Sequence, residues 1–313
     1  MKQNTLFQEF NIIGNYMGEY LIKYKSLLKL DSTVLITGET GTGKELIARW
    51  IHFMDDTRKD RPFVKITIPN IGENIFESEV FGYEKGAFTG AISSKKGLIE
   101  VAENGTIFLD EIENASPSIQ SKLLQLLEDR IYRKVGGTEY MSTEARFIVA
   151  TNVDLYKEVK KGLFRSDLYY RLAVLDICLP ALRDRQGDIV EIANHYIEKL
   201  NDKFGKGIKQ FERTHLNELL SYAWPGNIRE LRNFIEKQMV FTETNTLNLL
   251  ELKQRGSESR PTENSYKEYM DRVEREYIEK IYKQRNCKVE EVAEAIGMSV
   301  PFVYKKIKEH GIS

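Results

Sequence analysis

The sequence predicts an α/β fold: a parallel sheet followed by a helical segment, with a small all-α unit near the C-terminus. Short β-branched runs alternate with helical patterns in the first part of the chain, and a glycine-rich loop joins the first run to a helix. A polar stretch at 253–265 then precedes two short helices with helix-turn-helix spacing. We therefore expect a large α/β domain and a separate helical domain.

Five apolar runs are the expected strands, because each is short, rich in β-branched residues and bounded by polar or turn residues. They are residues 33–37, 63–68, 106–109, 147–150 and 174–179. Helical patterns fill the intervals, as parallel strands require, since each crossover must return the chain to the same edge of the sheet. The expected domains are an α/β subdomain at 1–180, a helical lid at 181–252, a linker at 253–265 and a helix-turn-helix domain at 266–313.

Composition limits the function classes. The 313 residues include 46 basic and 47 acidic side chains, so any contact with DNA must be local rather than a property of the whole chain. The two cysteines, Cys178 and Cys287, indicate a reducing compartment without a disulfide framework. The sequence shows no signal peptide and no apolar run long enough to span a bilayer. These features predict a cytoplasmic protein, whose association with the nucleoid would depend on local contacts with DNA.

The glycine-rich loop at 38–45, GETGTGKE, has the pattern of a phosphate-binding loop between a strand and a helix. Glycines let backbone N–H groups converge on phosphate oxygens, the helix N-terminus favours an anion, and a lysine supplies a point charge. One position departs from the general pattern, because an acidic residue stands where many such loops carry the Ser or Thr that touches magnesium. The candidate nucleotide-binding residues are Gly38, Glu39, Thr40, Gly41, Thr42, Gly43, Lys44 and Glu45.

A second candidate site segment is IFLDE at 107–111, a buried-strand pattern that ends in two adjacent carboxylates. At the carboxyl end of a strand, one acid can orient Mg²⁺ while the next reaches a water that attacks the γ-phosphate of ATP. We assign the metal-orienting role to Asp110 and the general-base role to Glu111. Adjacent acids are otherwise common at solvated helix starts, and the apolar run Ile107 to Leu109 directly before Asp110 favours the catalytic interpretation.

Six stretches together resemble one known family. They are GETGTGKELIA, ESEVFGYEKGAFTGA, GTIFLDEIEN, FIVATN, FRSDLYYRL and WPGNIREL, in this order. From 12 to 232 the chain resembles the central AAA+ ATPase domain of the sigma-54-dependent transcriptional activators, the bacterial enhancer-binding proteins. The glycine loop of that family resembles this one, Glu45 included. The resemblance implies an AAA+ ATPase with a helical lid, using ATP and Mg²⁺.

The GAFTGA segment resembles the family's contact with the sigma-54 subunit of the RNA polymerase holoenzyme. The residues concerned are Gly86, Ala87, Phe88, Thr89, Gly90 and Ala91. Glycine at both ends permits a tight exposed turn, with an apolar tip at its centre. The alternative is an ordinary hairpin.

Further site residues follow from the same resemblance. Thr151 and Asn152 match sensor I, near the γ-phosphate. Arg165 and Arg171 match arginine fingers, which act on the nucleotide of a neighbouring subunit and therefore imply a ring, expected to be a hexamer. The alternative for both arginines is an interface or surface ion pair.

The lid is expected to contribute one more site residue. Arg229 matches the sensor II arginine that reaches the nucleotide from the lid. Asn227 follows a Pro-Gly break and is predicted to cap the helix that begins there. His52, His195 and His215 lack metal-ligand spacing and are interpreted as structural.

One departure from the family bears on coupling. The family usually has an asparagine at the end of the second strand, linking nucleotide state to the GAFTGA loop through the catalytic glutamate. That position falls on Thr67, which keeps a hydroxyl but has a shorter reach and no amide. We expect hydrolysis with altered coupling, or replacement of the asparagine by Asn70 after a local shift.

The C-terminal helices resemble the Fis-type DNA-binding domain of the same family. The segment 280–313 holds seven Lys and Arg against four Asp and Glu, a local excess suited to phosphates. In the second helix, Val303 and Ile307 are expected to face the core. The candidate DNA-binding residues are Ser299, Val300, Pro301, Phe302, Tyr304, Lys305, Lys306 and Lys308. The alternative for this unit is a protein interaction module.

The expected function is that of a DNA-bound activator that uses ATP hydrolysis to convert the sigma-54 closed complex into an open complex. The glycine loop begins by Gly38, so we expect no N-terminal regulatory or receiver domain, and control by a regulatory protein or a homologous co-activator acting in trans. The rival interpretation is a DNA-binding regulator with a degenerate or uncoupled ATPase, acting by occupancy or only in a hetero-oligomer. A protein-unfolding AAA+ chaperone would not need the helix-turn-helix.

Overall fold

The computed structural model describes residues 12–25, 30–68, 73–208, 210–211, 216–242, 244, 246–247, 275, 278–279, 281–282, 285 and 288–310. The chain divides into two compact units, Met1–Leu249 and Leu250–Ser313. In the described ranges, no helix is both long and apolar enough to cross a membrane.

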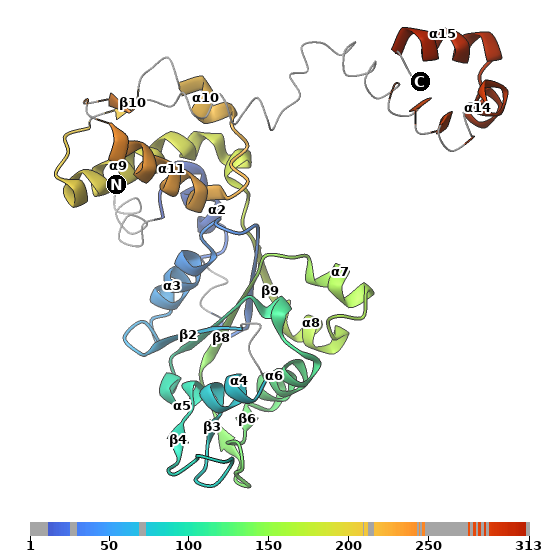
Figure 1. Ribbon diagram of the computed structural model, residues 1–313. Helices are drawn as coiled ribbons and strands as arrows, with labels where there is room; N and C mark the ends of the chain where they lie inside the picture. Colours follow the sequence, from blue (N-terminus) through green and yellow to red (C-terminus); the bar gives the residue numbers. More distant parts are fainter. Residues whose placement is uncertain are drawn as a thin grey trace. The chain divides into compact units, whose positions relative to one another are not determined.

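The first unit is built on a five-stranded sheet in which all neighbouring strands are parallel (Figure 1). Its strands are β1 (Val34–Thr37), β2 (Phe63–Thr67), β5 (Thr106–Asp110), β8 (Arg146–Thr151) and β9 (Leu175–Cys178), in the spatial order β2-β5-β8-β1-β9. All five predicted strands are confirmed, and each end differs from the prediction by at most one residue. Their carboxyl ends meet at one edge, where open α/β sheets bind ligands.

Helices cover both faces of the sheet. Alternate residues of one strand enter opposite cores: Ile107 and Leu109 of β5 lie in one cluster, and Phe108 lies in the other. The helices and 3₁₀ turns of this part are α2 (Asn15–Ile22), α3 (Lys44–Met54), α4 (Glu73–Val80), α5 (Leu98–Ala102), η2 (Ile112–Asn114), α6 (Pro117–Asp129), α7 (Leu155–Lys160) and α8 (Ser166–Leu172). The clusters bury residues of α2 and α3 in one layer and of α4 to α8 in the other.

Two short hairpins interrupt the α/β pattern. They pair β3 (Gly82–Tyr83) with β4 (Lys95–Lys96), and β6 (Ile131–Tyr132) with β7 (Met141–Ser142). A bridge between Tyr83 and Val135 joins them, and a side chain at Gly136 would meet Ala87 at 2.7 Å. The GAFTGA segment is therefore supported by a second loop.

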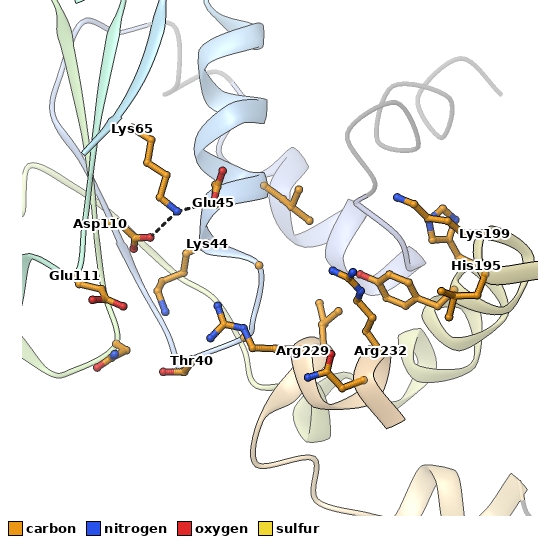
Figure 2. Close-up of a pocket in the computed structure, with 18 of the residues that line it drawn as sticks. Thr40, Lys44, Glu45, Lys65, Asp110, Glu111, His195, Lys199, Arg229 and Arg232 are labelled. Atoms are coloured by element: carbon orange, nitrogen blue, oxygen red, sulfur yellow. Dashed lines mark hydrogen bonds and ion pairs between the residues drawn. The ribbon is translucent and has the colours of Figure 1, made fainter. Parts of the chain in front are cut away.

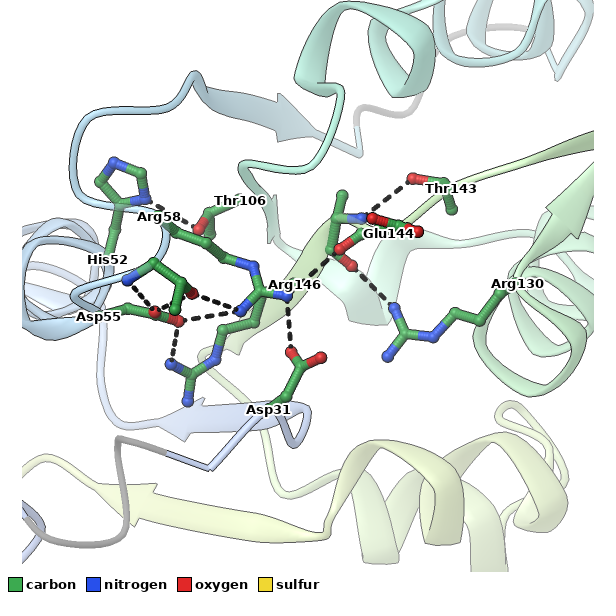
Figure 3. A network of polar contacts seen from close by, with 11 residues as sticks. Asp31, His52, Asp55, Arg58, Thr106, Arg130, Thr143, Glu144 and Arg146 are labelled. Atoms are coloured by element: carbon green, nitrogen blue, oxygen red, sulfur yellow. Dashed lines mark hydrogen bonds and ion pairs between the residues drawn. The ribbon is translucent and has the colours of Figure 1, made fainter.

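A buried polar network closes the amino-terminal edge of the sheet (Figure 3). Arg146, fully buried at the start of β8, pairs with Asp55 at 3.1 Å, and Arg58 pairs with the same carboxylate at 3.1 Å. Arg58 also pairs with Asp31, which precedes β1. Nearby, the ring of His52 on α3 is hydrogen-bonded to the hydroxyl of Thr106 at 2.8 Å, as expected for a structural histidine. The network joins α3 to three strands.

The helical lid consists of η3 (Leu182–Arg185), α9 (Gln186–Phe204), α10 (Leu216–Ser221) and α11 (Asn227–Phe241), with the small parallel pair β10 (Gln210–Phe211) and β11 (Thr246–Leu247). Trp224 is fully buried, donates its indole N–H to the carbonyl oxygen of Leu219, and packs edge-on against Phe234. This tryptophan therefore forms part of the lid core.

The prediction that Asn227 caps α11 is wrong. The N-cap residue is Gly226, without a side-chain cap. Asn227 adopts a left-handed φ of 52° and is fully buried. Its amide oxygen accepts from the N–H of Leu182, and its amide nitrogen donates to Glu39 and to the carbonyl oxygen of Thr40. The side chain is used for a long-range contact between the lid and the glycine loop, which helix-cap statistics do not anticipate.

The second unit contains α14 (Val289–Ile296) and α15 (Val300–His310), joined by a turn in which Gly297 has a φ of 70°. Val303 is fully buried, and Ile307 packs against the same small core, as predicted. Val300 is also partly buried there, because the first turn of α15 faces α14. The linker 253–265 and most of 266–287 lie outside the described residues.

Candidate functional site

A cavity of about 580 Å³ lies at the carboxyl edge of the sheet, between the glycine loop and the lid helices (Figure 2). The lid lies against the glycine loop there, because the N–H of Ile228 donates to the carbonyl oxygen of Gly41. The cavity lining is Thr40, Gly41, Gly43, Lys44, Glu45, Leu46, Lys65, Asp110, Glu111, Asn152, His195, Tyr196, Lys199, Leu200, Lys203, Ile228, Arg229, Arg232 and Asn233.

The glycine loop has the backbone conformation that its sequence requires. Gly38, Gly41 and Gly43 have φ values of 148°, 82° and 103°. Residues with a side chain rarely adopt such positive φ values. Lys44 begins α3 and donates from Nζ to the carbonyl oxygens of Gly38 and Glu39, at 2.7 and 3.1 Å. Burial lowers the pKa of Lys44, and the negative charge of Asp110 opposes that shift. Two backbone carbonyl oxygens of the loop thus hold the ammonium of Lys44, which lines the cavity.

Asp110 and Glu111 enter the cavity from the end of β5. Asp110 ends the strand, and Glu111 adopts a left-handed φ of 59° in the turn before η2. An L-residue in this conformation is uncommon and is often found where function requires it. Asn114 of η2 donates its amide to Glu111 at 3.3 Å. The turn therefore aims two consecutive carboxylates into the same cavity, although a regular strand would separate them.

Lys65 of β2 also lines the cavity, although the sequence motifs did not identify it as a site residue. Its ammonium contacts Glu45 at 2.7 Å and Asp110 at 3.2 Å (Figure 2). Burial pulls the pKa of Lys65 down, but hydrogen bonds to Glu45 and Asp110 outweigh it and raise the pKa. Glu45, in the first turn of α3, also pairs with Arg49 at 2.8 Å. The register of the sheet would have pointed to Lys65, because it lies two residues before the position paired with Asp110.

Glu39 connects the glycine loop to the lid. Arg183 of η3 donates to the Glu39 carboxylate at 2.9 Å, and Asn227 donates to it at 3.1 Å. These two hydrogen bonds, that from Arg183 first, lower the pKa of Glu39 to about 2. Thr42 donates its hydroxyl to the backbone of Glu39. Glu39 and Thr42 therefore support the loop, and neither lines the large cavity.

Of the predicted sensor residues, Asn152 and Arg229 line the cavity. Thr151 is fully buried, and its hydroxyl accepts from the N–H of Val153, so it supports the turn after β8. The lid adds polar residues that sequence reasoning missed: His195, Tyr196, Lys199, Lys203, Arg232 and Asn233. Their spacing on α9 and α11 places them on one helix face, a signal that is informative only once that face is known to meet the glycine loop. His195 therefore borders the site, and His215 lies outside the described residues.

A second, smaller apolar pocket adjoins the glycine loop. Its lining includes Ile12, Ile13, Ile47 and Ile192, and also Gly43 at the start of α3. Its volume is only about 30 Å³, and Thr42 and Arg185 also line it, so it is a small gap between the glycine loop and the lid.

The two predicted arginine fingers lie away from this chain's own cavity. Arg165 forms a bidentate pair with Asp167, at 3.0 and 2.7 Å, and donates to Ser121. Arg171 donates twice to the carbonyl oxygen of Leu127 near the end of α6. Both side chains are on exposed residues, where a second subunit can reach them.

The GAFTGA segment forms a closed, exposed turn between β3 and β4. The N–H of Gly86 donates to the carbonyl oxygen of Ala91 at 2.9 Å, and both Gly86 and Gly90 have left-handed φ values. Phe88 is 47% exposed although its ring contacts Tyr83, and Ile92 beyond the turn is 84% exposed. The turn thus presents apolar surface to solvent.

Thr67 lies at the end of β2, directly opposite Asp110 in the sheet. Residue Thr67 is exposed, and the side chain that donates a hydrogen bond to the Glu111 carboxylate is that of Asn114. Asn70, the suggested replacement, lies outside the described residues.

Residues 13–178 match the model of the sigma-54 interaction domain, and residues 183–268 match that of the AAA+ ATPase lid domain. The first match spans more than half of the chain. The chain belongs to the sigma-54 interaction domain family. The fold of the large unit is accordingly the AAA+ α/β sheet with its helical lid.

Several curated members of this family are similar over much of the chain. Identity to nitrogen fixation protein AnfA of Azotobacter vinelandii is 36% over 313 residues, covering 98% of this chain and 58% of AnfA. Regulatory protein AtoC of Escherichia coli is 39% identical over 291 residues, covering 90% and 63%. The DNA-binding transcriptional activator HyfR of Escherichia coli is 46% identical over 248 residues, covering 79% and 37%. The chain thus spans between 37% and 63% of these relatives.

Solved structures give the same fold. NtrX from Brucella abortus in complex with ATP superposes with a TM-score of 0.68 at 29% identity, covering 95% of this chain and 68% of NtrX. NtrX has also been crystallised with ADP, with a TM-score of 0.69 at 28% identity. At 18% identity, the likeness to Hsp104, with a TM-score of 0.51, concerns the fold alone.

Proposed function

We propose that this member of the sigma-54 activator family is a DNA-bound AAA+ ATPase that remodels the sigma-54 RNA polymerase closed complex into an open complex. The observation that carries the proposal is the cavity that gathers Lys44, Asp110, Glu111, Asn152 and Arg229 from four separate segments. The GAFTGA turn on the same domain supplies a surface for the sigma factor.

The donor set fits ATP with Mg²⁺. Gly41 and Gly43 bring the glycine loop to the cavity, Lys44 supplies positive charge, and Asp110 offers carboxylate oxygens, which Mg²⁺ prefers. Bound Mg²⁺ would neutralise charge on the phosphates. Glu111 would take the proton of the attacking water, with Asn114 holding its carboxylate. Arg229, which lines the cavity, would contact the phosphates from the lid.

The arginines imply an assembly. Arg165 and Arg171 are bound within their own subunit, away from its cavity, which suits a role on the nucleotide of a neighbour. We propose a head-to-tail ring, most simply a hexamer, in which each site is completed by the next subunit.

The helices α14 and α15 would bind upstream DNA. Tyr304 is 58% exposed, and the side chain of Lys305 is 71% exposed. Exposed lysines would hold phosphates, while Pro301, Phe302 and Tyr304 would meet the groove. Val300 packs in the core, so it contributes less than the other candidate residues.

The first test compares the wild type with Glu111→Gln and Thr89→Ala, using purified sigma-54 holoenzyme and a sigma-54 promoter. Glu111→Gln should lower ATP turnover by about 10²-fold or more while retaining nucleotide binding, because it removes the base but keeps the shape. Thr89→Ala should retain ATP turnover but form no open complexes. Open complexes would be measured by the permanganate reactivity of the melted DNA.

A second function, a DNA-binding regulator with an uncoupled ATPase, is favoured by the exposed Thr67 at the end of β2. Turnover without open complexes in the wild type would support it. A wild type that neither binds nor hydrolyses ATP would refute the proposed ATPase.

A further inference from the structure

Lys65 is an unusual element of the cavity because it places a positive charge among the carboxylates. Its ammonium lies 2.7 Å from Glu45 and 3.2 Å from Asp110, the acid assigned to Mg²⁺. Asp110 lies in the same cavity lining as the glycine loop. One of the oxygens available to a metal or its waters is therefore already in contact with a cation of the chain itself.

The position of Lys65 is fixed by the fold. β2 pairs with β5 along its whole length, so the Lys65 backbone cannot move without the sheet. The side chain passes 5.9 Å from the ring centre of Phe108, and its two acidic partners come from α3 and β5. The side chain is 33% exposed, and two carboxylates on separate elements hold its ammonium.

We propose that Lys65 is a tethered cation of the nucleotide site. It makes nucleotide binding less dependent on Mg²⁺ than binding would be if Asp110 and Glu45 faced the phosphates without this cation. The inference rests on the proposed nucleotide site. Without Mg²⁺, Lys65 reduces the repulsion between these acids and the phosphates. With Mg²⁺, Lys65 competes for Asp110 and weakens metal binding. Removing the charge of Lys65 should therefore weaken nucleotide binding without Mg²⁺ and strengthen the binding of Mg²⁺.

The experiment measures binding rather than turnover. A fluorescent ADP analogue is titrated with the full chain, first in EDTA and then with saturating Mg²⁺. The readout is the Kd in EDTA divided by the Kd with Mg²⁺. Lys65→Met should raise this ratio about tenfold, mainly by weakening binding in EDTA. Half-saturation by Mg²⁺ should shift to a lower concentration. Lys65→Arg, which keeps the charge, should stay near the wild type.

Lys59→Met is the matched control. Lys59 also forms an ion pair, with Asp56 at 3.2 Å, but it does not line the cavity. Its ratio should equal that of the wild type. Lys65→Gln serves as a second neutral variant if Lys65→Met is poorly folded, as judged by thermal unfolding.

The outcomes separate the inference from the proposed function. An unchanged ratio in both neutral Lys65 variants, or an equal loss of affinity with and without Mg²⁺, would overturn the role of Lys65 while leaving the nucleotide site intact. Absence of binding by the wild type under both conditions would overturn the nucleotide site itself, and the inference with it.

Discussion

Glu39 is the residue that ties the glycine loop to the lid. Its carboxylate accepts from Arg183 and from Asn227, which lie in different parts of the lid. These contacts stabilise the ionised form and bring the pKa of Glu39 to about 2, against an ordinary value of 4.5. Since the side chain of Glu39 is 43% exposed, solvent screening limits how much stability the pair contributes.

The depressed pKa of Glu39 predicts an acid dependence of stability. As the pH falls, Glu39 is protonated near pH 4.5 in the unfolded chain but only near pH 2 in the folded chain. The stabilisation is therefore complete above pH 4.5 and is lost as the pH falls toward about 2. Thermal unfolding should show Glu39→Gln less stable than the wild type at neutral pH, with the difference shrinking through that window. Asp60→Asn, on an exposed residue, is the control. A difference that stays constant down to pH 2.5 would contradict this assignment.

Sequence reasoning located individual site residues where a motif fixes the backbone. Lys44, Asp110 and Glu111 were predicted and do lie around one cavity. Asn227 was predicted to cap a helix, but it contacts Glu39 instead. Local cap patterns carry no information about a contact 188 residues away. Lys65 was missed because a lysine within a strand is usually a solvated surface residue.

Among the elements, α3 and β8 are joined by the pair between Asp55 and Arg146. Arg146 is fully buried, and only 8% of the Asp55 side chain is exposed. A buried charge depends strongly on its partner, because the desolvation of both ions has already taken place.

Replacing Asp55 should therefore be costly. Asp55→Ala removes the carboxylate that faces Arg146 and Arg58, and we expect a loss of about 3–5 kcal/mol in unfolding free energy. Denaturant unfolding followed by tryptophan fluorescence would measure it, since Trp50 lies in the α3 core. Asp56→Ala, beside it and 78% exposed, should change stability by about 0.5 kcal/mol or less. Equal effects of the two variants would refute the role of the pair.

The inner strands β1, β5 and β8 were predictable because a strand buried on both faces is apolar along most of its length. The outer strands β2 and β9 also carry Lys65 and Asp176, and their β-branched residues made them predictable. The two hairpins were not, since strands of two residues have no periodicity to detect. The support of the GAFTGA turn by the loop near Gly136 depends on contacts between these hairpins, and only the structure places them together.

At the scale of the whole molecule, the proposed ring means that one chain alone would have an incomplete site. Asp110, Glu111 and Arg229 line its cavity, while Arg165 and Arg171 lie elsewhere. The sequence indicates this division only through family resemblance, because nothing in a single chain states which arginine faces a neighbour.

Mixing two inactive variants tests the ring. If Arg165 acts on a neighbouring subunit, Arg165→Ala and Glu111→Gln should each hydrolyse ATP poorly alone. In mixed rings, an Arg165→Ala subunit keeps its base and receives an intact arginine from a Glu111→Gln neighbour, so turnover should partly recover. Phosphate release at varied mixing ratios would measure the recovery. Turnover no higher than the sum of the separate variants would indicate that Arg165 acts within its own chain or not at all.

The close approach of Gly41 to the lid affects how variants of the glycine loop are interpreted. A methyl group at Gly41 would meet the carbonyl oxygen of Gly226 at 2.3 Å, and the carbonyl oxygen of Gly41 accepts from Ile228. The lid thus constrains Gly41 independently of any contact that the loop makes with a phosphate. Genetic screens that score such substitutions as loss of nucleotide binding would be counting damaged subdomain packing as well, and an Ile228 or Gly226 suppressor could restore a glycine-loop mutant without touching a ligand.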